Sequence, residues 1–243
     1  MRTRMLWVAV CAVVTMGVGS RPMQAEKTMA CPAGTYDMLD WMTLDSSLNR
    51  KYHMAGNANP LYTNMSSGKF YWTKGANGSP WDIQLFDNNY IYLWITELNW
   101  NDPHTFKKFA NNTNLPLVPR CAKAGFPGSS IKVPNTSYQT YSDCTHYITQ
   151  NLRTGVNQVW GPYNISLGGN LPNNLQVLVA SYRYNCDVNY TNCGDKEEYY
   201  LAQKYGLVQW VHYSLVKGVY QMQQKTIFNR LVSGGTQPVF PCF

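Results

Sequence analysis

Two adjacent runs of alternating residues, Trp81–Phe86 and Tyr90–Leu98, constrain the fold more than any other part of the chain. The polar sequence Asp87-Asn88-Asn89 separates them and predicts a tight turn between two β-strands. One face of the second run is aliphatic and the other is aromatic, with Ile91, Leu93 and Ile95 on the first and Tyr90, Tyr92 and Trp94 on the second. A strand that is apolar on both faces is covered on both sides. The chain therefore contains central strands buried between layers.

The same kind of alternation predicts further strands along the rest of the chain. They cover Lys69–Lys74, Ser130–Val133, Leu175–Tyr184, Glu198–Tyr205, Leu207–Leu215 and Tyr220–Val232, with a hairpin turn at Lys217-Gly218. Lys51–Ser67 and Trp100–Pro119 are rich in polar and turn-forming residues, which predicts long loops.

Two segments have helical character. In Cys144–Trp160 an apolar residue recurs at every fourth position until Gly161-Pro162, which predicts a helix. Cys31–Arg50 mixes acids with apolar residues and predicts a short helix or a turn-rich entry segment. Strands outnumber helices and do not alternate with them. We therefore predict an all-β fold, a two-sheet antiparallel sandwich resembling a jelly roll, with one short helix and long loops.

Residues 1–25 have the pattern of an export signal. Arg2 and Arg4 precede the apolar run Met5–Val18, and Ala25 supplies a small residue for cleavage. The apolar run is shorter than the roughly 20 residues needed to span a bilayer, and no later run is long enough. We predict a secreted protein, extracellular or periplasmic, in which residues 26–243 form a single sandwich domain.

Charge argues against a nucleic-acid partner. The chain has 20 basic and 13 acidic residues, and removing residues 1–25 takes away three arginines and lowers the net charge from +7 to 17 − 13 = +4. The longest basic clusters outside the signal are the pairs Arg50-Lys51 and Lys107-Lys108. A nucleic-acid-binding protein is expected to carry a clustered basic stripe instead.

The cysteine count also indicates export. Of seven cysteines, Cys11 lies in the signal, and the even number that remains predicts three disulfide bonds. The short intervening loop favours a bond between Cys186 and Cys193. Sequence does not decide the other pairings. We predict a bond between the two ends of the chain, Cys31 and Cys242, with Cys121–Cys144 completing the set.

The segment Glu197–Trp210, EEYYLAQKYGLVQW, resembles the closing strands of secreted concanavalin-like jelly-roll proteins, many of which act on carbohydrates. The chain as a whole resembles exported bacterial proteins. This resemblance implies a jelly-roll sandwich and a carbohydrate ligand. The Glu-x-Asp-x-x-Glu motif of jelly-roll glycoside hydrolases is absent, as are the motifs of alginate-type lyases. The resemblance therefore implies no particular reaction.

A carbohydrate ligand would stack on exposed aromatic rings and bond to polar groups at their rim. Trp41 and Trp100 each lie beside polar or acidic residues, and Asp102 and His104 follow the second of them. These residues are the predicted ligand-binding residues. Trp94 and Trp210 lie within strand patterns, which favours core packing for both.

Carboxylates on the two opening strands permit three interpretations. Asp82 and Glu97 are candidate catalytic residues because glycoside hydrolysis uses a pair of carboxyl groups, and His53 is a candidate base for a lyase. Asp82, Asp87 and Asn88 could instead hold Ca²⁺, which prefers oxygen ligands. Structural neutralisation by lysine, arginine or backbone donors is the third interpretation.

Taken together, the sequence predicts an exported β-sandwich that binds or degrades polysaccharide and does not decide whether it is an enzyme. The alternative is a structural or surface-matrix protein that assembles through aromatic-rich sheets, and a third hypothesis is a small-molecule or inhibitor-like binding module. Six Asn-x-Ser/Thr sequons, relevant only to a eukaryotic secretory route, lie at Asn64, Asn77, Asn111, Asn135, Asn164 and Asn189.

Overall fold

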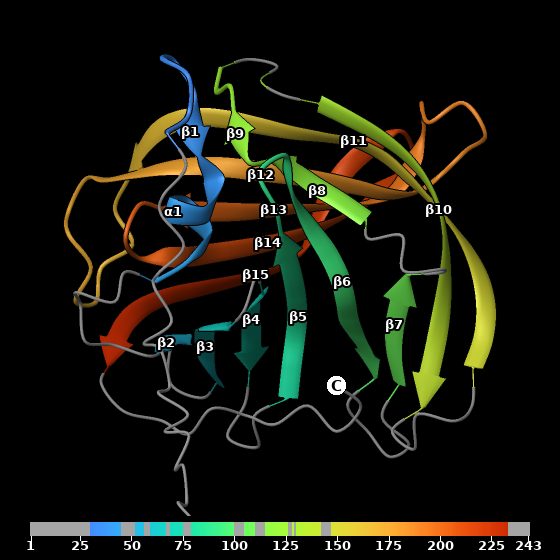
Figure 1. The fold of residues 1–243 in the computed structure, drawn as a ribbon, viewed down its shortest axis with the longest axis horizontal. Coiled ribbons are helices and arrows are strands. Elements are labelled where there is room, and N and C mark those ends of the chain that lie inside the picture. The colour runs from blue at the N-terminus through green and yellow to red at the C-terminus, as the bar shows by residue number, and fades with distance from the viewer. Residues whose placement is uncertain are drawn as a thin grey trace, which may run out of the picture.

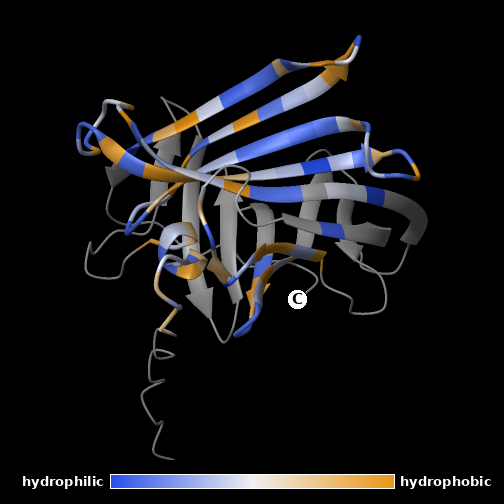
Figure 2. Cartoon of the chain, turned by 90° about the horizontal axis from the view of Figure 1, so that it is seen from above, coloured by the Kyte–Doolittle hydropathy of each residue, from blue (hydrophilic) through white to orange (hydrophobic). Residues whose placement is uncertain are grey.

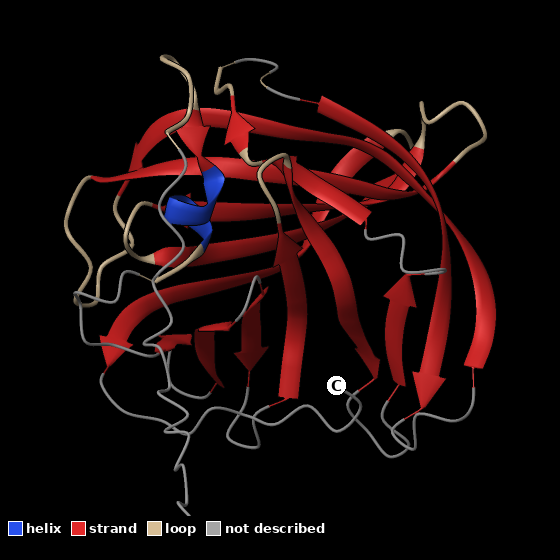
Figure 3. Cartoon of the chain, viewed as in Figure 1, coloured by secondary structure: helices blue, strands red, loops and turns tan. Residues whose placement is uncertain are grey.

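The computed structural model describes residues 30–44, 52–55, 59–66, 69–74, 79–99, 105–109, 115–125, 128, 130–141 and 147–232. Strands make up most of this part of the chain (Figure 3). The elements are β1 (Tyr36–Asp37), α1 (Met38–Met42), β2 (Tyr52–Ala55), β3 (Asn59–Ser66), β4 (Lys69–Lys74), β5 (Ser79–Phe86), β6 (Tyr90–Asn99), β7 (Thr105–Phe109), β8 (Leu115–Pro119), β9 (Cys121–Ala122), β10 (Ser130–Tyr141), β11 (Tyr147–Ile165), β12 (Leu175–Cys186), β13 (Cys193–Ala202), β14 (Gly206–Val216) and β15 (Val219–Val232).

The strands form an antiparallel two-layer sandwich, as predicted. Strands that follow one another in the sequence are mostly neighbours, in the order β5-β4-β3-β2-β15-β14-β13-β12-β11-β10-β7-β6-β8, and β5 also pairs with β6. Figure 1 shows β5, β6 and β7 running crosswise to the strands β12 to β15. Crosswise packing of this kind encloses a core between the two layers.

The core lies between these layers and is closed at one end by α1. Met38 and Met42 of α1 are fully buried, and the helix packs against β13 and β14. Ile91 and Leu93 of β6 and Ala180 of β12 belong to the same apolar cluster. A large part of the stability comes from this burial, because each fully buried aliphatic side chain contributes roughly 1.5–3 kcal/mol.

Asp37 and Arg120 connect the start of α1 to the rest of the sandwich. The Asp37 carboxylate caps the helix by accepting a hydrogen bond from the Leu39 backbone N–H at 3.0 Å. Arg120 donates hydrogen bonds to both oxygens of the same carboxylate, from Nε to Oδ1 and from Nη2 to Oδ2, the second at 3.0 Å. Both side chains are less than 8% exposed. The guanidinium also lies over the Phe86 ring, 5.5 Å from its centre.

Two disulfide bonds lie in the described part of the chain, and they correct the predicted pairing in part. The predicted Cys186–Cys193 bond is present. Cys31, however, bonds to Cys121, so the predicted Cys31–Cys242 and Cys121–Cys144 bonds are wrong. The reason is that β1 pairs with β9, which places Asp37 opposite Cys121 and brings the two sulfurs together. Cys144 and Cys242 themselves lie outside the described residues.

The predicted helix over Cys144–Trp160 is wrong, because this segment contributes to β11 instead. β11 is 19 residues long and pairs with β10 on one side and β12 on the other. The register of β11 against β12 shifts between Trp160 and Tyr163, where Gly161 and Pro162 lie. The strand continues past these two residues, which the sequence pattern predicts as the end of the helix. A glycine and a proline within a strand commonly mark such irregularities.

Most of the other predicted elements are confirmed. β4, β5, β6, β12, β14 and β15 occupy the expected segments, and the predicted short helix appears as α1. β13 overlaps the predicted strand Glu198–Tyr205 only in part, because it begins at Cys193 and ends at Ala202, before a turn. The expected loops are shorter than predicted, because β2 and β3 lie within Lys51–Ser67 and β7 and β8 within Trp100–Pro119. β10 extends well beyond the predicted Ser130–Val133. In the described residues, no helix has the length and apolar character needed to cross a membrane.

Candidate functional site

Strand β13 places chemically different side chains on its two faces. Successive residues of a strand point to opposite sides of the sheet, and Figure 2 shows polar and apolar residues alternating along the described strands. Asp195, Glu197 and Tyr199 therefore share the face that borders the core, where Tyr199 is 4% exposed. We call this the inner face and the opposite side the outer face, which carries Lys196 and Glu198.

Glu197 lies at the centre of a cluster on the inner face. Its carboxylate accepts hydrogen bonds from the Tyr184 hydroxyl at 3.1 Å and from the Trp210 indole N–H at 3.0 Å. The Tyr199 hydroxyl donates a third, short hydrogen bond to the same carboxylate. All three donors are neutral aromatic groups, so the carboxylate is held in place by hydrogen bonds without an opposing charge.

Two pairs of stacked rings flank Glu197 on the neighbouring strands. Tyr182 and Glu197 are opposite each other across β12 and β13, and Glu197 is opposite His212 of β14. The Tyr182 and Tyr184 rings stack with centres 5.1 Å apart and planes 20° apart. Trp210 and His212 stack with centres 6.1 Å apart and planes 8° apart. A pair of stacked aromatic rings thus lies on each of the two strands that neighbour the Glu197 carboxylate.

Asp195 lies two residues before Glu197 and extends the cluster toward solvent. Its carboxylate accepts hydrogen bonds from the Asn185 amide at 2.7 Å and the Ser214 hydroxyl at 3.0 Å. The His212 Nε2 lies 3.3 Å from the same carboxylate. The side chains of His212 and Asp195 are 24% and 22% exposed, so this end of the inner face is open to solvent.

We define the inner-face cluster as the side chains of this face that surround the two carboxylates. Its members are Tyr182, Tyr184, Asp195, Glu197, Tyr199, Trp210, His212 and Ser214, together with Asn185, whose amide donates to Asp195. They come from β12, β13 and β14, which form the centre of one layer. Rigid neighbouring strands hold such side chains in place more closely than loops do.

The outer face carries a second carboxylate cluster with a different charge balance. Glu198 accepts a hydrogen bond from the Tyr213 hydroxyl at 3.0 Å and one from the Tyr200 hydroxyl at 3.3 Å. Unlike Glu197, it also forms an ion pair with Lys196 at 2.7 Å. The Lys196 ammonium lies over the Tyr213 ring, 4.0 Å from its centre. The outer cluster is therefore neutralised internally.

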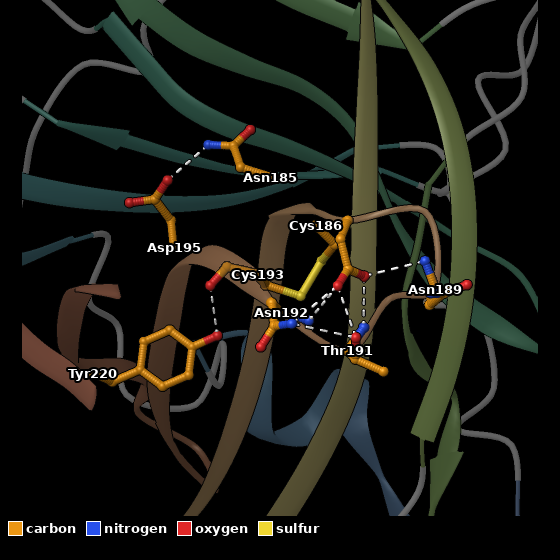
Figure 4. The surroundings of a disulfide bond; sticks show 9 residues. Asn185, Cys186, Asn189, Thr191, Asn192, Cys193, Asp195 and Tyr220 are labelled. Atoms are coloured by element: carbon orange, nitrogen blue, oxygen red, sulfur yellow. Dashed lines mark hydrogen bonds between the residues drawn. A yellow bond between two sulfur atoms is a disulfide. The ribbon is translucent and has the colours of Figure 1, made fainter. Parts of the chain in front are cut away.

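The hairpin that joins β12 to β13 borders the open end of the inner-face cluster. The Cys186–Cys193 bond closes its base, and Tyr220 donates a hydrogen bond to the Cys193 carbonyl at 2.9 Å (Figure 4). Asp187 organises the loop by accepting hydrogen bonds from the Thr191 hydroxyl at 2.7 Å and the Thr191 backbone N–H at 2.9 Å. These Thr191 hydrogen bonds, together with those from Asn192, lower the pKa of Asp187 to about 2.

No protein-family model, curated protein or solved structure matches this chain. The resemblance of Glu197–Trp210 to jelly-roll closing strands therefore stays a prediction.

The predicted ligand-binding residues do not gather at this cluster. Trp41 is 3% exposed and packs edge-on against Tyr36 with ring centres 5.5 Å apart, so it is a core residue. Its position gives no support to a role in stacking on a ligand at the surface. Trp100, Asp102 and His104 lie outside the described residues.

The predicted catalytic residues lie on three different strands. Asp82 of β5 is opposite Thr96 of β6, while Glu97 is opposite Phe106 of β7, so the two acids are not a directly opposed cross-strand pair. His53 lies on β2, opposite Leu61 of β3. The side chains of His53, Asp82 and Glu97 lie outside what the structure describes, and their catalytic role stays a prediction.

Asp87, predicted to bind Ca²⁺ with Asp82 and Asn88, closes the turn between β5 and β6. Its carboxylate accepts hydrogen bonds from the backbone N–H groups of Asn89 and Tyr90 at 2.7 and 2.8 Å and from the Tyr92 hydroxyl at 2.9 Å. Burial opposes its ionisation, but these donors together lower the pKa of Asp87. Among the described residues, no group of three or more His, Cys, Asp or Glu side chains could hold a metal ion.

Sequence reasoning missed Glu197 and Asp195 as site residues, although one signal was present. Acids at alternate positions of an otherwise buried strand must point toward the core or toward its opposite side. The run Asp195-Lys196-Glu197-Glu198 places one of its two charge sets inside, whichever register the strand adopts. Trp210, which the sequence predicts to pack in the core, is half-buried and packs against the core cluster while its indole N–H donates to Glu197.

The raised pKa values of several partly buried tyrosines predict that the protein loses stability in alkali. Burial and the charge of Glu198 raise the pKa of Tyr200 to about 12, and burial and Asp87 do the same for Tyr92. Burial, followed by Glu197, also raises the pKa of Tyr184. In the unfolded chain a tyrosine ionises near its ordinary pKa of about 10. The neutral phenols therefore stabilise the fold fully below about pH 10, and this contribution is lost as the pH rises toward about 12.

A spectrophotometric titration of tyrosinate checks this expectation. The native protein should ionise a group of tyrosines only above the midpoint of the denatured protein, and the free energy of unfolding should fall over the same pH interval. Coincident titration curves for the native and denatured protein would contradict the described burial of these hydroxyls.

Proposed function

We propose that this protein is an exported carbohydrate-binding protein that holds its sugar on the inner-face cluster. The observation that carries the proposal is the placement of Glu197 between two pairs of stacked rings, Tyr182–Tyr184 and Trp210–His212. A sugar ring combines apolar C–H faces with hydroxyl donors. Flat aromatic surfaces next to a carboxylate suit both parts of such a ligand.

Access to the cluster supports the same function. Asp195 and His212 are partly exposed, whereas Tyr199 farther along the inner face is buried. A ligand that enters at the Asp195 end would meet polar groups first and the rings around Glu197 next. The two disulfide bonds support export, since structural disulfides persist mainly outside the cytoplasm.

Binding is better supported than cleavage. Three neutral donors occupy the Glu197 carboxylate, which fixes it as a hydrogen-bond acceptor. A carboxylate has about four acceptor sites, so it retains capacity for a ligand hydroxyl. Polysaccharide degradation has no separate observation in its favour among the described residues.

The chain supplies a matched pair of substitutions for the test. Glu197→Gln should weaken binding of a recognised oligosaccharide about tenfold or more, because a charge-assisted acceptor is lost. Glu198→Gln changes the adjacent residue, which has similar tyrosine partners on the outer face, and should leave the affinity within about twofold. Calorimetric titration with neutral, amino, N-acetylated and uronate oligosaccharides measures both effects.

Two results would overturn the proposal. One is the absence of binding to any member of the oligosaccharide panel by the wild-type protein. The other is an equal effect of the two substitutions, which would show that the inner face is not the binding surface. Large species in sedimentation without added sugar would favour the alternative of a protein that assembles through its aromatic-rich sheets.

A further inference from the structure

Beyond the neutral Glu198–Lys196 pair, the outer face carries positive charge in excess. β12, β14 and β15 contain no aspartate or glutamate, so Glu198 is the only carboxylate that β12 to β15 place on this face. Arg183 shares the outer face because it is opposite Lys196. Lys225 shares it because it is opposite Val211, which is itself the partner of Glu198. Three cations therefore share this face with one carboxylate.

Arg183 is the cation that the structure leaves without an anion. It lies directly opposite Lys196 across β12 and β13, and like charges in such a cross-strand pair destabilise a sheet. Lys196 is compensated by Glu198 at 2.7 Å. Among the described residues, no carboxylate forms an ion pair with Arg183. Its Nε atom is buried and has no hydrogen-bond partner, which is rare for a buried donor.

The Arg183 guanidinium is nevertheless held in one place. Its central carbon lies 5.9 Å from the centre of the Tyr220 ring, and the Lys196 ammonium lies 5.2 Å from the same centre. The hydrogen bond from Tyr220 to the Cys193 carbonyl at 2.9 Å fixes that ring. Because Nε is already out of water while the side chain is partly exposed, an anion at the terminal nitrogens needs little further ordering of the guanidinium.

Aromatic rings beside Arg183 make this surface suitable for a sugar ring. Tyr213 and Tyr220 are half-buried, and the Lys196 ammonium lies 4.0 Å from the centre of the Tyr213 ring. Tyr213 is opposite Met222, which is 60% exposed, so this part of the face is open to solvent. We define the outer patch as Arg183, Lys196, Glu198, Tyr213 and Tyr220.

The charges of the outer patch define the ligand that fits it. The Arg183 guanidinium matches a carboxylate or sulfate group, to which it can donate two parallel hydrogen bonds. Glu198 lies beside it and accepts hydrogen bonds from hydroxyl groups, but it repels a second anion. A fitting ligand therefore carries a single oxyanion next to hydroxyl groups and an apolar ring face. Acidic sugars combine these groups, whereas a nucleic acid brings a closely spaced row of phosphates.

We propose that the outer patch binds an acidic polysaccharide, with Arg183 receiving the carboxylate or sulfate group of one sugar. The ring of that sugar stacks on the tyrosines, and its hydroxyls bond to Glu198. This site and the inner-face cluster lie on opposite faces of β13, so the inference does not depend on the proposed function.

The test compares a uronate tetramer, the same tetramer with methyl-esterified carboxylates, a sulfated neutral tetramer and inorganic sulfate. By calorimetry, the wild-type protein should bind the uronate or the sulfated tetramer at least about tenfold more tightly than the esterified one. This preference should shrink as sodium chloride is added. Arg183→Gln should remove most of the preference, and Arg183→Lys, which keeps the charge without the planar fork, should retain part of it. Arg230→Gln, at an exposed arginine of β15, should preserve it.

Four results would overturn the inference. They are equal wild-type binding of the acidic and esterified tetramers, equal losses in Arg183→Gln and Arg230→Gln, tighter binding of a DNA duplex than of either acidic tetramer, and no binding of any acidic probe. Inorganic sulfate bound as tightly as the tetramers would overturn the polysaccharide and retain the oxyanion. Thermal unfolding of the arginine variants controls for loss of the fold.

Neutral oligosaccharides separate this inference from the proposed function, because they lack the group that Arg183 would bind. Their binding should fall in Glu197→Gln and stay unchanged in Arg183→Gln. The preference for an acidic tetramer should show the reverse pattern. Loss of that preference in Glu197→Gln alone would place the acidic sugar on the inner face, which would overturn the outer patch and leave the proposed function standing.

Discussion

Replacing Arg120 with methionine is expected to lower the free energy of unfolding by about 3–5 kcal/mol, because the buried Asp37 carboxylate would lose its cation. Asp37 and Arg120 are each less than 8% exposed, so water cannot replace the lost partner. For a domain of this size the melting temperature should fall by about 10 °C. Chemical denaturation of the purified protein measures the change directly.

The control for this substitution is an arginine that the structure leaves in solvent. Arg230 of β15 is exposed, and Arg230→Met should change stability by no more than about 0.5 kcal/mol. Asp37→Leu combined with Arg120→Met removes both charges and should recover part of the loss. A single Arg120→Met variant as stable as the wild-type protein would show that the ion pair does not hold β1 and α1 in place.

Removing the Cys31–Cys121 bond should destabilise the protein by about 4–5 kcal/mol on the chain-entropy account, because the bond closes a long loop. The two cysteines are 90 positions apart, whereas Cys186 and Cys193 are only 7 apart. The double serine variant of the second pair should therefore lose less, about 2–3 kcal/mol. Denaturant unfolding of both double variants gives the two values.

One result would contradict the expected order of the two disulfide variants. A larger loss for the Cys186–Cys193 variant would mean that loop length does not govern the contribution of these bonds. Arg120 directly precedes Cys121, so removing the ion pair and the bond together should show a combined loss that differs from the sum. Additive losses would indicate that the two attachments of the N-terminal segment act independently.

Alternation identified the fold class and most strands, because a period of two is specific to strands when apolar and polar residues truly alternate. In Tyr90–Leu98 aliphatic and aromatic residues alternate instead, which indicates a strand covered on both sides. The helix predicted for Cys144–Trp160 is wrong because the apolar residues of this segment are four positions apart. Four is an even number, so such residues share one face of a strand as well as one stripe of a helix. The pattern alone therefore cannot separate the two.

The disulfide pairing could not be predicted for a different physical reason. The contact between Cys31 and Cys121 depends on pairing between β1 and β9, which are two residues long each. Two residues are too few to produce a detectable pattern. The sequence contains one sign of the inner-face cluster, because acids on an otherwise buried strand are unusual. Its partners, such as Tyr184 and Trp210, become apparent only when β12, β13 and β14 lie in register.

The back-to-back placement of Glu197 and Glu198 limits what sequence change β13 can accept. A shift of this strand by one residue would exchange its two faces completely. Lys196 would then enter the interior beside His212, and Tyr199 would leave the core for the opposite side. Insertion or deletion of a single residue in β13 is therefore more damaging than most replacements within it, and length variation in this region should be confined to the hairpin tips on either side.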